Sequence, residues 1–158
     1  MKGFNGIFMK QERKILNHLL VNVFNKILRI EEKMIREESD LELTVTEMHT
    51  IDAIGLDKER NMTEIADILS ITVGTLTSSI NRLLNKGYVT RLRDEGDRRV
   101  VRIMLSEKGV AAYRIHEAYH EKMIGHILDE ITDEEAKLLG STLVKISEFF
   151  KVEYKVED

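Results

Sequence analysis

Histidine residues in the second half of the chain form its most chemically suggestive motif. His116, Glu117 and His120 spell HExxH, a helical pattern in which two histidines bind zinc and the glutamate activates water. His126 follows at the position where one class of zinc protease places a third ligand. On a continuous helix it would lie about 15 Å along the axis from His116, too far for one zinc ion with ligands at about 2 Å. We therefore expect no protease. The sequence also has no P-loop and no nucleophile elbow, so we predict that the protein is not an enzyme.

The same histidines leave a noncatalytic metal site open. His49 could approach His116 and His120 and complete three zinc ligands. The alternative is a group of hydrogen-bonded histidines packed at a junction of helices. Our main interpretation has no metal and no cofactor, and the three-histidine zinc site stays as the alternative.

The composition indicates a folded, helix-rich protein of one domain. The chain has 158 residues, of which 42% are hydrophobic and 33% charged, with no cysteine and no proline. The lack of cysteine excludes disulfides and thiolate chemistry, and the lack of proline permits long helices. The longest apolar run is the four residues from Val110 to Tyr113, and the opening MKGFNGIF lacks a signal-peptide core. We therefore expect a cytoplasmic protein that makes no contact with a membrane.

Charge is distributed unevenly along the chain. The net charge is −4, but the segment from Thr72 to Arg102 carries +4, which leaves −8 for the rest. The basic residues of this segment are Arg82, Lys86, Arg91, Arg93, Arg98, Arg99 and Arg102. A basic patch on an acidic body is typical of a protein that binds phosphate with one face. A solvated charged hairpin would give the same pattern.

Long helices are predicted at both ends of the chain. From Met9 to about Glu38, apolar residues recur at three- and four-residue steps, and further apolar residues widen this stripe. The stripe is wider than one short neighbouring helix can cover, so we expect a second subunit to bury it. The other long helices run from Ser106 to about Glu130 and, after a capping box at Thr132 and Glu135, to about Tyr154.

Two short helices precede the basic segment. Thr44 and Glu47 have the spacing of a capping box and open a helix that ends at Gly55. Thr63 is the expected N-cap of a second helix, from Glu64 to Leu69.

A longer helix and a hairpin follow. Thr72 is the expected N-cap of a helix that runs to Lys86, with Gly87 just after its end. Two β-prone runs, Tyr88–Arg93 and Val100–Leu105, flank the turn-like sequence DEGD. This order of elements predicts a winged helix-turn-helix, a mainly α fold with a small β-hairpin wing and long N- and C-terminal helices. We expect one domain over residues 1–158, with a DNA-binding winged-helix lobe at about 44–105.

The helix from Thr72 suits the DNA major groove, which is about 12 Å wide and admits one α-helix. Its outward face has small hydroxyl-bearing side chains, and arginines in the hairpin can neutralise phosphates or enter a narrow minor groove. Small polar residues also occur on ordinary exposed helices. We predict DNA contacts from Thr72, Thr75, Thr77, Ser78, Ser79, Arg82, Arg91, Arg93, Arg98 and Arg99. Arg98 is expected to contact DNA. For Arg99 two roles stay open: a contact with DNA, or an ion pair with a nearby aspartate.

The segment ITVGTLTSSINRLLNKGYVTRLRDEGDRRVVRIMLSEKG, residues 71–109, resembles the DNA-binding core of the MarR family of bacterial transcriptional regulators, including a DRR wing signature at residues 97–99. The long N- and C-terminal helices resemble the dimerisation region of that family, which implies dimerisation helices at about 9–38 and 106–154. The resemblance implies a homodimeric regulator that binds a pseudo-palindromic operator in double-stranded DNA.

A closer resemblance links EMHTIDAIG, ITVGTLTSSINRL and YRIHEAYH to the fatty-acid-biosynthesis repressors of Gram-positive bacteria, which belong to the same family. It implies repression of fatty-acid synthesis genes, with a long-chain acyl group on acyl carrier protein as corepressor. The expected ligand-binding residues are Met48, His49, Ile51, Asp52, His116 and His120. Three alternatives remain: a zinc-responsive regulator of the same family that uses His49, His116 and His120, a zinc hydrolase, and a winged helix that binds only proteins.

Overall fold

The computed structural model describes residues 2–38, 41–93 and 101–154 of the chain. These residues divide into two compact units, residues 1–45 and residues 46–158, and each unit is described by itself. None of the helices in the described segments is long and apolar enough to cross a membrane.

The first unit is a long helix. Helix α1 spans Lys2–Lys33 and continues into a short π-helix, η1, at Met34–Glu38. The predicted start at Met9 is therefore wrong, because the helix begins seven residues earlier. The glycines in its opening weaken a helix without ending it, and no proline stops it.

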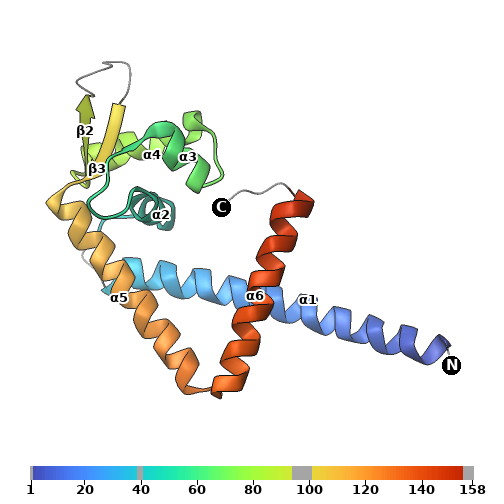
Figure 1. The fold of residues 1–158 in the computed structure, drawn as a ribbon. Coiled ribbons are helices and arrows are strands. Elements are labelled where there is room, and N and C mark those ends of the chain that lie inside the picture. Colours follow the sequence, from blue (N-terminus) through green and yellow to red (C-terminus); the bar gives the residue numbers. More distant parts are fainter. Residues whose placement is uncertain (1, 39–40, 94–100, 155–158) are drawn as a thin grey trace. The chain divides into compact units, whose positions relative to one another are not determined.

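The second unit contains the predicted winged helix-turn-helix (Figure 1). Its helices are α2 (Val45–Ile54), α3 (Met62–Ile68), α4 (Val73–Asn85), α5 (Glu107–Asp129) and α6 (Asp133–Tyr154). Its strands are β1 (Arg60–Asn61), β2 (Val89–Arg93) and β3 (Val101–Leu105), which form an antiparallel sheet in the order β1-β3-β2. The fold prediction, mainly α with a small β-hairpin wing, is confirmed.

The N-cap of α3 differs from the prediction. Asn61, rather than Thr63, caps this helix, and its Oδ1 accepts the backbone N–H groups of Thr63 and Glu64, each at 2.9 Å. Glu64 completes a capping box by accepting the N–H of Asn61 at 2.7 Å. Asn61 also pairs with Arg102 as the last residue of β1, so one residue ends a strand and starts a helix.

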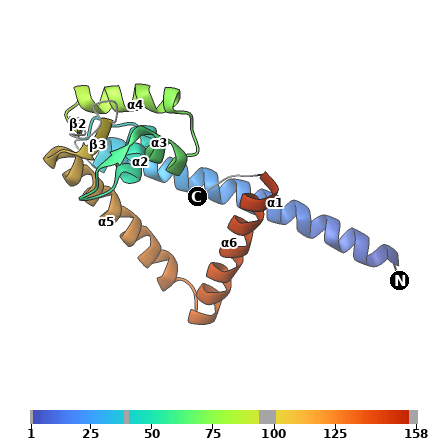
Figure 2. The same ribbon diagram turned by 45° about the horizontal axis from the view of Figure 1, so that its top comes forward.

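A single hydrophobic core joins α2, α3, α4 and the sheet. It contains Met48, Ile51, Ile54, Ile65, Ala66, Leu76, Ile80, Leu83, Tyr88, Val89, Ile103 and Leu105, all buried. Figure 2 shows α4 at the outer edge of this lobe, with α2 and α3 on one side of it. The core therefore covers one face of α4 and leaves the other available.

The beginning of α5 is tied to the end of α4. Ser106 caps α5 by accepting the N–H of Gly109 at 3.1 Å, and its hydroxyl donates to the carbonyl of Gly87 at 2.6 Å. Lys108 Nζ donates to the carbonyl of Lys86 at 3.0 Å and lies 4.2 Å from the centre of the Tyr88 ring. Gly87 has a φ of +77°, a conformation that favours glycine and turns the chain from α4 into β2.

Candidate nucleic-acid interface

Helix α4 has one buried and one exposed face. Leu76, Ile80 and Leu83 recur at helical spacing and are fully buried. Thr72 is the N-cap, as predicted: its Oγ1 accepts the backbone N–H of Thr75 at 3.1 Å, and the two threonine hydroxyls lie 2.9 Å apart. Both threonines are exposed, so the positive end of the helix dipole faces solvent, where it favours a phosphate.

The exposed face carries polar side chains along the whole helix: Thr75, Thr77, Ser78, Asn81 and Arg82. The hydroxyl of Thr77 donates to the carbonyl of Val73 at 2.7 Å, one turn earlier in the helix. It therefore offers a base edge an oxygen lone pair, which can accept from an exocyclic amino group, rather than a hydrogen.

Ser79 corrects the predicted set of DNA contacts. The side chain is buried, at 3% exposure, and its Oγ lies 3.0 Å from Oγ1 of Thr50 on α2. Thr50 is also buried, and its hydroxyl contacts the carbonyl of Thr46 at 2.8 Å. This hydrogen bond satisfies two polar groups inside the lobe, so Ser79 joins α4 to α2 and does not lie on the exposed face.

A buried carboxylate holds the C-terminal half of α4. Glu47 on α2 is fully buried, and its Oε1 accepts from Nε of Arg82 at 3.2 Å. Its Oε2 accepts from Nζ of Lys86 at 2.8 Å. The side chain of Arg82 remains 55% exposed and that of Lys86 31% exposed. One internal anion thus fixes two cations that belong to the predicted DNA-binding helix.

The base of the wing is connected to the same helix. Arg91 on β2 donates from Nη2 to Oδ1 of Asn81 on α4 at 2.8 Å, and both side chains are exposed. Arg93 is the last residue of β2. The remaining predicted wing contacts, Arg98 and Arg99, lie outside the described residues.

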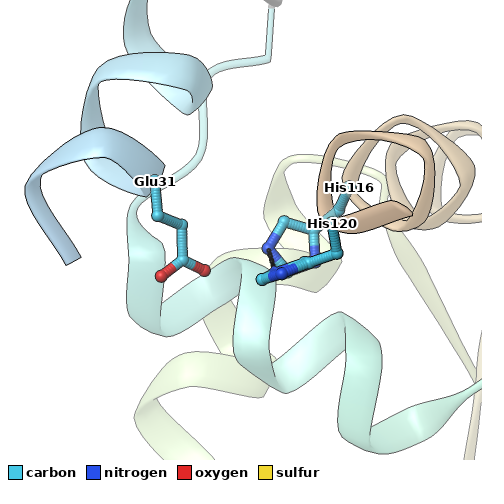
Figure 3. A group of neighbouring side chains, drawn as sticks. All are labelled: Glu31, His116 and His120. Carbon is cyan, nitrogen blue, oxygen red and sulfur yellow. Dashed lines mark hydrogen bonds between the residues drawn. The ribbon is translucent and has the colours of Figure 1, made fainter. Parts of the chain in front are cut away.

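A cluster of imidazoles lies where α2 and α5 meet. His116 is buried, and its Nδ1 lies 2.8 Å from Oδ2 of Asp52. Its Nε2 lies 3.1 Å from Nε2 of His120, and Figure 3 shows these two rings side by side on α5. His49 is more distant, with its ring centre 6.2 Å from that of His116. A neutral His116 that donates to Asp52 keeps a lone pair on Nε2, which can accept from His120 or bind a cation.

Two carboxylates lie close enough to Tyr113 to affect its titration. Burial, together with the carboxylates of Glu117 and Asp52, raises the pKa of Tyr113 on α5.

Met48 and Ile51, also predicted to bind ligand, are fully buried in the core of the lobe. A ligand role for these two residues stays a prediction and requires the core to open.

The chain is similar in sequence to known transcriptional regulators. A model of the MarR family matches residues 41–100. The transcriptional regulator ZitR of Lactococcus lactis subsp. cremoris is 30% identical over 117 residues, which are 72% of this chain and 80% of that protein. The chain belongs to the MarR family.

Solved structures agree with this assignment. The structure of Streptococcus pneumoniae FabT in complex with DNA is 36% identical, covers 88% of this chain and 97% of FabT, and has a TM-score of 0.84. A mutant MarR from E. coli complexed with operator DNA matches at 24% identity over 85% of this chain and 95% of its own, with a TM-score of 0.69. That second likeness concerns the fold alone.

Membership of the MarR family makes this protein a DNA-binding transcriptional regulator and not an enzyme. The histidine spacing agrees, because α5 is continuous from Glu107 to Asp129 and therefore carries His126 away from His116 along the helix.

Two buried residues that contact side chains of α4 have no signal for this role in the sequence. Glu47 and Thr50 make their contacts with partners 35 and 29 residues away. The local sequence around Glu47 indicates only the start of a helix, and that around Thr50 indicates only an ordinary position within a helix.

Proposed function

We propose that two copies of this chain form a homodimer that represses transcription by binding a pseudo-palindromic operator. The observation that carries this proposal is the exposed, hydroxyl-bearing face of α4, whose opposite face is fixed by the core. A MarR-family dimer can place two such helices about 34 Å apart, one turn of DNA. FabT, which was solved in complex with DNA, supports the proposal through its similarity over most of both chains.

The proposed DNA contacts divide by chemistry. Thr72, Thr75, Thr77 and Ser78 lie at or near the start of α4, and we assign them to base edges and adjacent phosphates in the major groove. Arg82 and Arg91 are exposed cations for the phosphate backbone. Arg93, Arg98 and Arg99 are assigned to the wing, where an arginine can neutralise a phosphate or enter a narrow minor groove.

The proposed dimer uses the long helices. Leu16, Leu19, Val23 and Phe24 on α1 are each more than half exposed, as is Leu138 on α6. Apolar surface of this extent is unfavourable in water and typical of a subunit interface. We therefore assign residues 9–38 and 106–154 to dimerisation and residues 44–105 to DNA binding, within one domain. Light scattering of a chain lacking residues 1–25 tests this assignment, and we expect the dimer to be lost. A truncated chain that remains as dimeric as the full chain would contradict the assignment.

Regulation is proposed from the sequence resemblance to fatty-acid-biosynthesis repressors. The target genes would be those of fatty-acid synthesis, and a long-chain acyl group on acyl carrier protein would act as corepressor. Such a ligand strengthens DNA binding only if it binds the DNA-competent conformation better than the other. The assigned ligand residues are Met48, His49, Ile51, Asp52, His116 and His120. We place the protein in the cytoplasm, since its proposed target is genomic DNA.

A gel-shift experiment tests the proposal. The probe is the promoter of the protein's own gene, titrated with the full-length protein in the presence and absence of acylated carrier protein. We expect a shift that becomes stronger with the acylated form and is unchanged by unacylated carrier protein. A shift that ignores the acyl group contradicts the corepressor, and no binding to this promoter or to a fatty-acid synthesis promoter contradicts the repressor role.

A second candidate function, a metal-responsive regulator, is favoured by the geometry of His116 and His120. Two imidazoles on one tetrahedral zinc ion place their nitrogens about 3.3 Å apart, since each Zn–N bond is about 2.0 Å. The Nε2 atoms lie 3.1 Å apart, and Asp52 contacts the opposite nitrogen of His116, as carboxylates beside zinc-bound histidines do. Calorimetric titration with zinc, using His116→Ala as the control, tests this candidate. Binding no stronger than that of the variant removes it.

A further inference from the structure

Glu47 occupies an unusual position for a charged side chain. Its residue is 0% exposed, yet its two ion-pair partners, Arg82 and Lys86, both reach the surface of α4. A buried carboxylate is costly unless it is paired and hydrogen-bonded, and here each oxygen has its own cation, at 3.2 Å and 2.8 Å. The arrangement therefore ties the position of two cations on α4 to the inside of the lobe.

The two cations are held differently. Arg82 contacts Glu47 through Nε, and its side chain remains 55% exposed. Its guanidinium has further N–H groups on two terminal nitrogens, which suit a phosphate oxygen. Lys86 directs its ammonium group to Glu47 at 2.8 Å and is 31% exposed, so its charge is directed into the protein.

We propose that Glu47 is a positioning residue for DNA recognition, which orients Arg82 towards one phosphate and withholds Lys86 from the duplex. This inference rests on the proposed binding of DNA by α4. The trio of one anion and two cations carries a net charge of +1, and removal of the carboxylate raises it to +2. A released lysine adds a phosphate contact to every duplex, whereas in the operator complex this gain is offset because Arg82 is no longer oriented by Glu47. Glu47 thereby favours the operator over other DNA.

The test compares Glu47→Gln with the wild-type protein on two duplexes of equal length: an operator selected by the wild type from a random library, and a scrambled version of it. Affinities are measured by fluorescence anisotropy between 50 and 200 mM salt. For the scrambled duplex, we compare the ratio of variant affinity to wild-type affinity at the two salt concentrations. This ratio should be about 3.5-fold larger at 50 mM than at 200 mM salt, which is the effect of one added phosphate contact. The ratio of operator affinity to scrambled affinity should fall by roughly fivefold or more.

Glu59→Gln is the matched control. It removes the same charge from an exposed position in the loop between α2 and β1, and it should leave both the salt dependence and the affinity ratio as in wild type. Equal weakening of both duplexes by Glu47→Gln, with an unchanged salt slope, would overturn the proposal and leave a purely structural role. Wild-type protein that selects no operator contradicts the proposed function instead.

Two further variants test the inference even if Glu47→Gln fails to fold. Arg82→Gln and Lys86→Gln each leave the buried carboxylate with one cation. Arg82→Gln should lower the salt slope by about one contact, whereas Lys86→Gln should leave it unchanged. Equal losses of slope in the two variants would show that Lys86 also contacts DNA, and would overturn the proposal.

Discussion

Replacing Gly109 with alanine should destabilise the protein, although alanine is normally the better helix former. Gly109 lies in the first turn of α5, where a Cβ atom would stand 2.0 Å from the carbonyl oxygen of Tyr88 and 3.3 Å from Cβ of Leu105. The first distance is more than an ångström below ordinary contact, so the backbone must move. That carbonyl accepts the N–H of Ser106 at 3.0 Å, and the movement weakens this hydrogen bond.

The expected loss follows from three contributions. Overpacking costs about 1–3 kcal/mol, the weakened hydrogen bond costs about 1 kcal/mol, and the helix propensity of alanine returns about 1 kcal/mol. The free energy of unfolding should therefore fall by about 1–3 kcal/mol. With a urea slope of roughly 2 kcal/mol per molar, the unfolding midpoint falls by about 1 M.

Gly125 provides the control on the same helix. A Cβ atom at Gly125 meets nothing within 4 Å, so Gly125→Ala should raise the free energy of unfolding by about 0.5–1 kcal/mol. Urea unfolding followed by circular dichroism at one protein concentration compares the two variants, since the midpoint of a dimer depends on concentration. A Gly109→Ala midpoint at or above that of wild type would refute the close approach of Tyr88.

The remaining predictions concern hydroxyl groups. Ser78→Ala should lower discrimination among operator variants by about 1–3 kcal/mol at a contacted base pair, and unchanged discrimination in binding assays would show that Ser78 only faces solvent. Ser79→Ala should instead cost about 0.5–1.5 kcal/mol of stability in urea unfolding, because it removes one hydrogen bond while the hydroxyl of Thr50 still donates to Thr46, with base preference retained. Hydrogen bonds from Thr132 lower the pKa of Glu135, so stability that is present above the usual glutamate pKa is lost as the pH falls through the lowered value. Thr132→Ala removes the hydroxyl donor and keeps the backbone N–H, so it should return this pKa only part of the way towards normal in an NMR titration, and an unshifted titration would argue against the hydroxyl hydrogen bond.

Features set by neighbouring residues could be predicted from the sequence. Thr72 and Gly87 mark the two ends of α4 because a cap and a left-handed turn depend on residues a few positions away. The strands β2 and β3 follow from β-prone runs on either side of a turn. For α3, the sequence contains both Thr63 and the capping-box pair of Asn61 and Glu64, and the pair sets the start of the helix, two residues earlier than predicted.

Features set by tertiary contacts could not be predicted. Ser79 lies near the boundary between the two faces of α4, where helical periodicity does not decide burial, and its partner Thr50 belongs to another helix. Glu47 matches a capping-box pattern locally, whereas its contacts with Arg82 and Lys86 depend on how α2 packs against α4. The strand β1 has two residues and no apolar pattern of its own, and its pairing with β3 defines it.

The contacts of Ser106 and Lys108 with the two residues that follow α4 have a mechanical consequence. They connect the first turn of α5 to the backbone that follows α4 through two hydrogen bonds. A rotation of α5 about this turn would therefore tilt α4. Helix α4 has 13 residues and is about 20 Å long, so a tilt of about 5° displaces its far end by about 1.7 Å. That far end is the threonine-capped start of the helix, and a displacement of this size is enough to break the hydrogen bonds that we propose it makes with base edges.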